Sequence, residues 1–431
     1  MKKAREGYKM TEFGEIPSEW EIKKLEELIT IKHGYAFKGE YITDNETNSI
    51  LVTPVNFRLG GGFLETKIKY YKDNIDVDKD YILDNNDIIV TMTDLSKDGG
   101  TLGYPALIPN DDKIYLHNQR IGKINIENKI VKKEFLFRLL CSERYRRYIL
   151  STASGTTVNH TSPSRILEYN AIIPTIYEQE KIASILSTVD EQIDNIDALI
   201  EKNKELKKGL MQTLLTKGIG HTKFKKTEVG EIPEEWKVKK LGDICEVKGG
   251  KRLPKGYQLE DEDNTFPYIR VADMYMGGIR QDNIKYVPKD IVDKIKIYKI
   301  SKDDLFISVA GTLGIVGQVP DELNGANLTE NADKLCNIQI NKVYLMKVLQ
   351  SNIIQSIIES EQTKSAQPKL ALTRIKDFLI PVPNDREQVK IAAILVEVDE
   401  KIEKYQNKKQ RLEELKKGLV QQLLTGKIRV V

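Results

Sequence analysis

The side chains in this sequence that could do chemistry are hydrogen-bonding groups in loops, and their types suit contact with nucleic acid. Arg and Lys bind the edge of guanine, Asn and Gln bind the edge of adenine, and Ser, Thr and backbone amides hold phosphates. Such groups gather in eight segments: KHGYAFKG (32–39), LSKDGGTLG (95–103), HNQR (117–120), SGTTVNHTSPSR (154–165), KGGKRLPKG (248–256), AGTLG (310–314), LTENAD (328–333) and TKSAQPK (363–369). Surface loops are polar in most proteins, so ordinary solvated surface is the alternative for each segment.

The candidate contact residues lie in these segments or directly beside them. In the first half of the chain they are Lys32, His33, Lys38, Ser96, Lys97, Thr101, Asn118, Gln119, Arg120, Thr157, Asn159 and His160. In the second half they are Lys248, Lys251, Arg252, Arg270, Thr312, Asn327, Asn331, Lys364, Gln367 and Lys369.

Motifs for catalysis are missing from the sequence. A DNA methyltransferase would carry an Asn-Pro-Pro-Tyr-type motif and a Gly-rich cofactor loop, and neither is present. The glycines of GTLGIVG (311–317) are spaced by three, which does not fit a dinucleotide-binding fingerprint, and no P-loop GKS or GKT occurs. Pro320-Asp321-Glu322 resembles the start of a nuclease motif but lacks the Glu-x-Lys element that would follow it. The sequence therefore predicts a non-catalytic protein without a cofactor.

Composition also argues against a metal site and a membrane segment. The cysteines Cys141, Cys245 and Cys336 match no zinc-ligand spacing, and the four histidines are scattered. No apolar run reaches the roughly 18 residues that span a bilayer, and no secretory leader is recognisable, so we expect a cytoplasmic protein. The formal net charge of +3 is almost neutral for 431 residues, and such a balance can still hide a basic face.

The segments expected to position these loops occur twice in the chain, as an internal sequence repeat. Residues 11–34 and 227–250 are identical at thirteen of 24 positions, and the only two tryptophans, Trp20 and Trp236, fall on each other. Residues 178–218 match 387–427 without a gap. Between these blocks the two halves diverge. The repeat predicts two heads of different sequence on one repeated framework.

Each later block predicts a long amphipathic helix. Apolar residues follow the 4-3 spacing of a coiled-coil seam, and Pro174 and Pro383 stand just before the two helices. The seam residues are Ile182, Leu186, Val189, Ile193 and Ile196 in the first copy and Ile391, Leu395, Val398, Ile402 and Tyr405 in the second. A helix over 178–216 is roughly 58 Å long at 1.5 Å per residue.

An apolar stripe of this length needs a partner, and the other copy is the obvious one. An antiparallel pair with an approximate two-fold axis suits a duplicated chain that returns on itself. The alternative is that each helix packs only on its own head.

The heads are predicted to be α+β. Strands are expected within 84–93 and 302–311 and within 114–126 and 328–340, and amphipathic helices over 134–150 and 343–360. The expected domains are head one (1–173), helix one (174–218), head two (219–380) and helix two (381–431). The expected fold is therefore two globular heads joined and spaced by an antiparallel coiled coil, with an internal pseudo-two-fold repeat.

With these blocks in view, the sequence resembles the specificity subunits of type I restriction–modification systems. Four features carry the resemblance: the GEIPxxW motifs (14–20 and 230–236), the "IP…EQ.KIA..L" helix starts, the "LKKGL.Q.LLT" helix ends and the GTLG-type loops of the heads. Together they span nearly the whole chain and occur in the same order in both halves.

This resemblance implies a function in DNA recognition. Members of the family carry two target recognition domains, and each reads one half of a bipartite, asymmetric site in double-stranded DNA. Their paired helices set the spacer between the half-sites and dock two methyltransferase subunits, through which restriction subunits join the complex. Two other functions remain open from the sequence: a two-headed protein-interaction scaffold, and a recognition subunit of a different restriction or methylation system.

Overall fold

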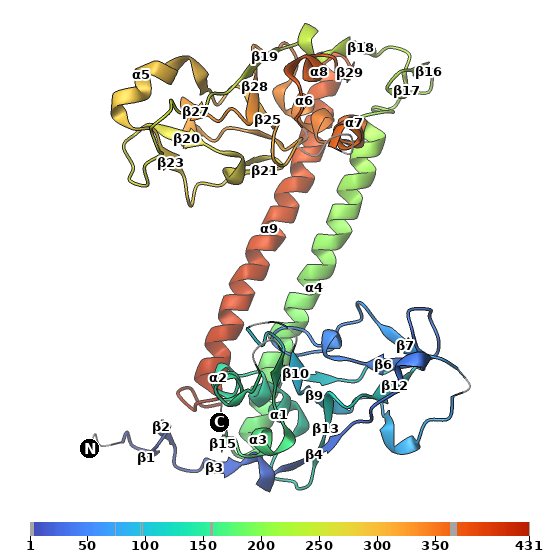
Figure 1. Cartoon of the computed structure of the whole chain (residues 1–431), viewed down its shortest axis with the longest axis vertical. Coiled ribbons are helices and arrows are strands. Elements are labelled where there is room, and N and C mark those ends of the chain that lie inside the picture. The colour runs from blue at the N-terminus through green and yellow to red at the C-terminus, as the bar shows by residue number, and fades with distance from the viewer. Residues whose placement is uncertain are drawn as a thin grey trace. The chain divides into compact units, whose positions relative to one another are not determined.

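The computed structural model describes residues 4–73, 75–94, 96, 98–155, 158–362 and 369–430 (Figure 1). The chain forms two compact units. The first unit contains residues 1–196 and 408–431, and the second contains residues 197–407. The two long helices, α4 (Ile176–Leu214) and α9 (Asp385–Leu423), each contribute one half to each unit. Both fall within the predicted helical segments 174–218 and 381–431.

The head of the first unit contains two main sheets. The first has the strand order β11-β9-β13-β4 and is antiparallel throughout. The second has the order β5-β7-β6-β12-β8, and its β6 and β12 run parallel. The bounds are β4 Ile29–His33, β5 Ile42–Thr43, β6 Ser49–Val52, β7 Lys69–Tyr71, β8 Ile82–Leu83, β9 Ile88–Thr91, β11 Pro105–Leu107, β12 Ile114–His117 and β13 Ile121–Ile126.

The second unit repeats this topology. Its antiparallel sheet has the order β19-β28-β25-β26, and its other sheet, β23-β20-β27-β24, again contains one parallel pair, β20 and β27. The bounds are β19 Glu246–Gly249, β20 Pro267–Ile269, β23 Lys285–Tyr286, β24 Lys299–Ile300, β25 Leu305–Ser308, β26 Val316–Gln318, β27 Ala326–Leu328 and β28 Ala332–Cys336. The predicted α+β class is confirmed. The predicted strand segments 84–93 and 302–311 contain β9 and β25. Segment 114–126 contains both β12 and β13, and segment 328–340 contains β28 and the last residue of β27.

Each predicted head helix is in fact two helices. The first is interrupted between α1 (Lys133–Leu140) and α2 (Glu143–Thr152), where the Ser142 hydroxyl accepts a hydrogen bond from the Tyr145 amide and caps α2. The second is also interrupted, between α6 (Lys342–Leu349) and α7 (Asn352–Gln362), and here the Ser351 hydroxyl donates to the Val348 carbonyl at 2.6 Å. The prediction of one continuous helix was wrong because the apolar period continues across the break.

The first residues of the predicted seam belong to the cores of the heads. Ile182 and Leu186 of α4 are fully buried in the core of the first unit, which also contains Leu423 and Leu424 from the end of α9. In the second unit the roles are exchanged: Ile391 and Leu395 of α9 pack with Leu214 and Leu215 from the end of α4. Each core is therefore completed by the beginning of one long helix and the end of the other.

An ion-pair hub shows the direction of the helices within each unit. In the first unit Asp190 of α4 pairs with Arg138 of α1 and, at 2.6 Å, with Lys416 of α9. In the second unit Asp399 of α9 pairs with Lys347 of α6 and, at 2.6 Å, with Lys207 of α4. Since early residues of one helix contact late residues of the other in both units, the predicted antiparallel pairing is confirmed within each unit.

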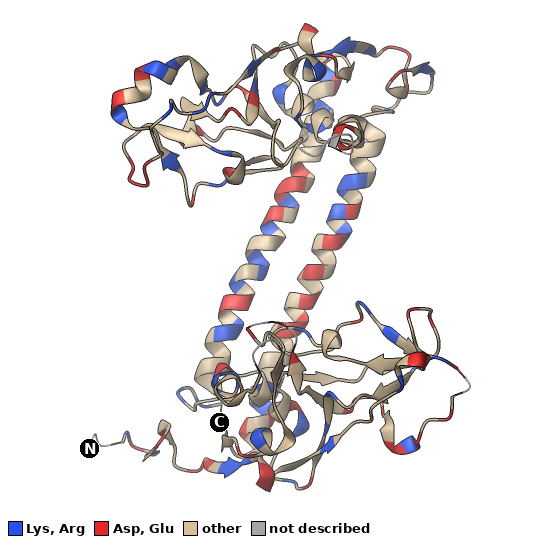
Figure 2. Cartoon of the chain, viewed as in Figure 1, with Lys and Arg blue, Asp and Glu red and all other residues tan. Residues whose placement is uncertain are grey.

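The carboxylates of the hubs are only partly exposed. Burial alone would raise the pKa of Asp399, but hydrogen bonds from Lys207 and Lys347 outweigh it and hold the pKa below its ordinary value. Lys347 is only 3% exposed, so Asp399 is the ionic partner that its buried side chain needs. Elsewhere along α4 and α9 residues of both charges alternate, as expected of solvated helix faces (Figure 2).

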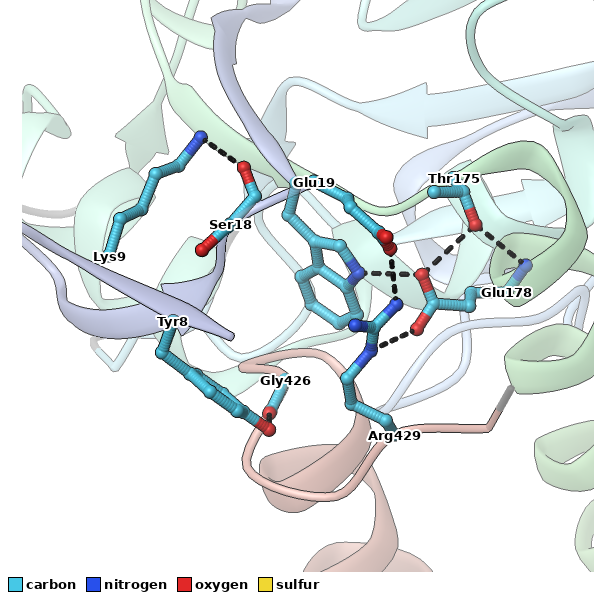
Figure 3. Close-up of polar contacts among 9 residues, drawn as sticks. Tyr8, Lys9, Ser18, Glu19, Thr175, Glu178, Gly426 and Arg429 are labelled. Atoms are coloured by element: carbon cyan, nitrogen blue, oxygen red, sulfur yellow. Dashed lines mark hydrogen bonds and ion pairs between the residues drawn. The ribbon is translucent and has the colours of Figure 1, made fainter. Parts of the chain in front are cut away.

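A buried carboxylate fixes each GEIPxxW motif to a long helix, and Figure 3 shows this for the first unit. The indole N–H of Trp20 donates to Glu178 Oε2 at 2.7 Å, and the indole N–H of Trp236 donates to Glu387 Oε2 at 3.0 Å. Both tryptophans are essentially inaccessible to solvent. The GEIPxxW motif and the EQ dipeptide of the helix start therefore recur together because they bind each other.

The glutamine of the EQ dipeptide is used in the same way in both units. Gln179 donates to the carbonyl groups of Pro174 and Ile130 and accepts a hydrogen bond from the Lys132 amide. Gln388 donates to the Pro383 carbonyl and accepts from the Asn341 amide. These buried amides join the helix start to the segment that precedes the first head helix.

A basic side chain contacts the second oxygen of each buried carboxylate. In the first unit Arg429 Nε lies 2.9 Å from Glu178 Oε1, its Nη2 lies 2.7 Å from Glu19, and the Tyr8 hydroxyl donates to the Gly426 carbonyl at 2.9 Å (Figure 3). In the second unit His221 Nε2 lies 2.9 Å from Glu387 Oε1. The C-terminal segment thus contacts the first GEIPxxW motif and the strand before it.

We expect Glu178→Ala to destabilise the first unit by about 3 kcal/mol, because the indole N–H and Arg429 lose a buried partner. The measurement is chemical denaturation followed by tryptophan fluorescence in a Trp236→Phe background, where only Trp20 reports. The matched control is Glu180→Ala, which removes an exposed pair with Lys132 and should cost under about 0.5 kcal/mol. Equal midpoints for the two variants would contradict the role of Glu178.

Candidate nucleic-acid interface

In the first unit, the loop that follows β9 is closed by one carboxylate. Asp94 ends the short strand β10 (Thr93–Asp94), and its Oδ1 accepts hydrogen bonds from the Ser96 amide and hydroxyl, both at 2.6 Å. Its Oδ2 accepts from the Thr101 amide at 2.5 Å and from the Thr101 hydroxyl at 2.6 Å. Four donors on one carboxylate give the loop a defined shape.

These bonds also set the ionisation of Asp94. Burial would raise the pKa of the carboxyl group, but the hydrogen bonds from Ser96 and Thr101 outweigh burial, so the pKa lies below its ordinary value of 3.8. The lowered pKa means that loop closure contributes stability above about pH 3.8 and loses it as the pH falls through the lowered pKa.

The backbone of Met92 binds two other predicted loops of the first unit, so that they lie beside the loop that Asp94 closes. The Met92 amide donates to the Arg120 carbonyl at 2.9 Å, and the Met92 carbonyl accepts from the Thr161 amide at 3.0 Å. The Asn159 side chain donates to the Ser96 carbonyl at 2.7 Å. Three segments that are far apart in the sequence, 94–101, 118–120 and 159–161, therefore lie together.

Val309 does the same in the second unit. Its amide donates to the Asn331 carbonyl at 2.7 Å, and its carbonyl accepts from the Leu370 amide at 2.9 Å. Ser308 then closes the shorter loop: its hydroxyl donates to the Thr312 carbonyl at 2.6 Å and accepts from the Ile315 amide at 2.8 Å. Thr312, Asn331 and Lys369 are brought together in this way.

In each unit, a glycine allows one more predicted loop, 32–39 or 248–256, to pack closely against the backbone of these loops. Gly34 and Gly250 occupy equivalent places, where a Cβ atom would lie 2.2 Å from the Asn118 carbonyl oxygen or 2.0 Å from that of Thr329. Neither backbone could remain there with a larger residue. The Lys251 amide donates to the Leu328 carbonyl at 2.9 Å, as the Tyr35 amide does to the His117 carbonyl at 2.8 Å.

Side chains of α2 and α7 donate hydrogen bonds to backbone carbonyl groups of the loops. Arg146 of α2 donates to the Gly99 carbonyl and, at 2.8 Å, to the Gly100 carbonyl. At the equivalent place on α7, Gln355 donates to the Gly314 carbonyl at 3.0 Å. Burial lowers the pKa of the Arg146 guanidinium, which also lies 4.7 Å from the ring centroid of Tyr104.

Most of the predicted contact residues are accessible. The exposed ones are His33, Lys38, Ser96, Gln119, Arg120, His160, Lys248, Lys251, Arg252, Thr312 and Lys369. Lys32, Thr101, Asn118, Asn159, Arg270 and Asn331 are partly buried. Lys97, Thr157, Lys364 and Gln367 lie outside the described residues.

Two predicted contact residues have structural roles instead. Asn327 is 2% exposed in β27, and its amide donates to the Ile295 carbonyl at 2.8 Å, so it cannot reach a ligand. The Arg270 guanidinium binds both oxygens of Asp273 and the Asn283 carbonyl, which fixes a turn and leaves it little capacity for bases.

Several exposed cations are already paired at the surface. Lys248 lies 2.5 Å from Glu246, and Arg252 lies 2.6 Å from Glu330. The partly buried Lys32 lies 3.6 Å from the Asp80 carboxylate and also donates to the Asp80 carbonyl at 2.8 Å. Such exposed pairs are weak in water, so a phosphate can replace the carboxylate.

Asp94 and Arg146 are the residues that sequence reasoning missed. A signal existed for Asp94, because Asp followed two residues later by Ser is typical of a turn closed by the side chain. No local signal exists for Arg146, whose partners are about forty-five residues away on the loop.

Other kinds of site are not visible in the part of the chain that the structure describes. There, no group of three His, Cys, Asp or Glu side chains is arranged to hold a metal ion, and the three cysteines are free. Within the same residues, none of the helices is long and apolar enough to cross a bilayer.

Two segments of the chain, residues 17–207 and 233–414, match the family model described as the type I restriction modification DNA specificity domain. The chain is 27% identical to the MjaVIII specificity subunit of Methanocaldococcus jannaschii over 424 residues, which covers 96% of this chain and 94% of the relative. It is 24% identical to the EcoBI specificity subunit of Escherichia coli over 390 residues, covering 87% and 78%.

Solved structures of similar proteins share the fold. An S subunit of a type I restriction–modification system from M. genitalium aligns with a TM-score of 0.57 at 22% identity, covering 94% of this chain and 96% of the other. A chain from a structural study of type I complex assembly aligns with a TM-score of 0.55 at 17% identity, covering 96% and 99%.

We expect Asp94→Asn to open the loop 94–101, because the amide group presents a donor to at least one of the two donor pairs. Backbone amides of Ser96 and Thr101 should exchange hydrogen about tenfold faster, as measured by mass spectrometry of peptides covering this loop. Asp98→Asn, in the same loop but exposed, is the matched control and should leave exchange unchanged. Identical protection in the two variants would show that Asp94 does not hold the loop.

Proposed function

The chain belongs to the family of type I restriction–modification DNA specificity proteins, and on that premise we propose that each of its two units reads one half of a bipartite, asymmetric DNA site. The observation that carries the proposal is the gathering of three polar segments around Met92 in the first unit and around Val309 in the second. The same backbone arrangement presents HNQR in one unit and LTEN in the other.

The difference between the two heads supports an asymmetric site. The loop that follows β9 spans residues 92–100, whereas the loop that follows β25 spans only residues 309–311 before the shared Thr-Leu-Gly sequence. Two readers with different side chains and loop lengths bind different base sequences, whereas two identical readers would bind a palindrome. We therefore infer two unlike half-sites.

The proposed contacts divide into two classes. Exposed Lys and Arg side chains such as Lys38, Lys251 and Arg252 would bind phosphates and hold the register. Gln119 and Arg120 in the first unit and Thr312 in the second are the proposed base readers, because they are exposed and lie in the gathered loops. Binding through these cations should weaken as the salt concentration rises, since phosphate neutralisation releases counterions.

We infer that catalysis belongs to partner subunits. Two methyltransferase subunits would dock on the framework that repeats in the two units, because a repeated surface fits two copies of one partner. Restriction subunits would join through that complex, and a cytoplasmic location accords with action on cellular DNA. The chain itself would supply recognition and no catalytic group.

The long helices are proposed to set the distance between the half-sites. The cores of both units contain parts of α4 and α9, so the helices cannot change length without moving the heads. Two alternative functions remain: a protein-interaction scaffold, and a recognition subunit of another restriction or methylation system. In either case the two helices would have another role than spacing the half-sites of a type I system.

The first test is the methylation pattern that the chain directs. Expressed with the methyltransferase encoded beside it, in a host without DNA methylation, the chain should produce methylation at one bipartite sequence, detected by single-molecule sequencing. Replacing residues 25–169 with the corresponding head of a relative should change one half-site and leave the other and the gap intact. The absence of any sequence-specific methylation would refute the proposed function and favour the scaffold.

The second test concerns the gap. Seven residues inserted between Ile196 and Asp197, with seven more between Asn407 and Lys408, add two turns to each helix and about 10.5 Å of length. At about 3.4 Å per base pair, the unread gap should lengthen by about three base pairs. Altered half-sites with an unchanged gap would exclude the helices as the spacer.

A further inference from the structure

A turn of the same construction follows the parallel strand in each head. After β6, Thr53 and Asn56 exchange hydrogen bonds around the 3-10 helix Pro54–Asn56. After β20, Arg270 and Asp273 do the same around the 3-10 helix Val271–Asp273. The backbone then turns through Gly60 and Gly61 in the first unit and through the equivalent glycines in the second.

Both turns end in exposed apolar side chains. Leu59 is 70% exposed, and at the equivalent place in the second unit Met276 is 47% exposed. Val55, four residues before Leu59, is 43% exposed, and Tyr275, directly before Met276, is 45% exposed. One exposed apolar residue needs no explanation, but its recurrence at the tip of two matching turns does.

The tip of the first turn lies against the loop that Asp94 closes. A shallow hollow of about 340 Å³ is lined by Pro54, Val55, Phe57 and Leu59 on one side and by Asp94, Ser96, Gly100 and Thr101 on the other. A Cβ atom on Gly100 would lie 3.6 Å from Leu59 Cδ2. Leu59 is therefore part of the same surface as the proposed polar contacts.

The second turn is held beside its loop by the backbone. The Gly277 amide donates to the Val316 carbonyl at 2.8 Å, directly after the loop that contains Thr312. A Cβ atom on Gly317 would lie 2.6 Å from the Gly278 amide nitrogen, so the turn and the strand that follows the loop are in close contact. Met276 thus lies at the tip of a turn that is held against β26, the strand that follows its loop.

The pattern of variation favours DNA over a protein partner as the occupant. A partner common to both units would need the same side chain twice, yet the turn is retained while the tip changes from Leu to Met and its neighbour from Arg58 to Tyr275. A stable protein interface also buries roughly 1,200–2,000 Å², far more than the tip of one turn offers. Varying side chains on a constant turn are typical of specificity.

We propose that Leu59 and Met276 make apolar contacts with the 5-methyl group of a thymine, one in each half-site. This inference rests on the proposed function and adds an apolar reader to the polar loops. The thymine methyl is the apolar group that the major groove presents, and only an uncharged, exposed side chain can bury it without losing hydrogen bonds.

The experiment uses the complex of this chain with its methyltransferase and duplexes that carry the mapped site, with each thymine replaced in turn by uracil. Uracil lacks only the methyl group. For the wild-type complex, one replacement in each half-site should weaken binding about threefold to fivefold, the value of one buried methyl group. Leu59→Ala should weaken binding to the unmodified site similarly and abolish the uracil effect in the first half-site alone, and Met276→Ala in the second alone.

Ile297→Ala is the matched control, because Ile297 is 73% exposed but belongs to neither turn and lies in the 3-10 helix Lys296–Tyr298. It should change neither binding nor the uracil effects. If Leu59→Ala and Met276→Ala behave like the control while the wild type is sequence-specific, the inference fails and the proposed function stands. If these variants weaken assembly with the methyltransferase and leave the uracil effects intact, the turns contact protein and the inference also fails. If the wild-type complex shows no sequence-specific binding, both the proposed function and this inference are refuted.

Discussion

The rest of the structure depends on a buried carboxylate at the start of each long helix. Glu178 and Glu387 accept the indole hydrogen of the one tryptophan in their unit, and each also contacts a basic side chain from the segment that follows the opposite helix. A carboxylate in the interior is stable only when its oxygens are satisfied, so three segments must meet before it can be buried. This requirement joins the GEIPxxW motif, the helix start and the end of the other helix into one framework.

On that framework the heads can vary in sequence without losing their arrangement. The hubs at Asp190 and Asp399 hold the first head helix against both long helices, and they keep their geometry although the cation is Arg138 in one unit and Lys347 in the other. The loops in turn depend on backbone hydrogen bonds of Met92 and Val309, which any residue except proline can make. Side chains at the loop surface are therefore free to differ, which is what two unlike readers need.

The repeat, the two helices and the α+β heads could be predicted from sequence because each leaves a local or periodic pattern. The breaks at Ser142 and Ser351 could not, since the apolar period continues across them. Asn327 sits next to a polar loop in the sequence but points into the core, where a carbonyl from a distant helix turn satisfies it. Its polarity alone predicted that Asn327 is a surface residue, and only the tertiary contact shows that it is buried. The gathering of the loops was likewise invisible, because it uses backbone groups that carry no sequence signal.

The contacts of Arg429 and Tyr8 have a consequence for the entropy of the chain. In the second unit the end of α4 and the following GEIPxxW motif are joined by a short covalent segment, so little chain freedom is lost when they meet. In the first unit, Gly426 and Arg429 contact Tyr8 and Glu19 at the equivalent joint. These contacts close a loop that contains nearly the whole polypeptide. Closure entropy grows with loop length, so the first joint loses more freedom than the second for similar contacts. An arginine shared by two carboxylates, in place of a histidine on one, stands at the joint where backbone continuity gives no help.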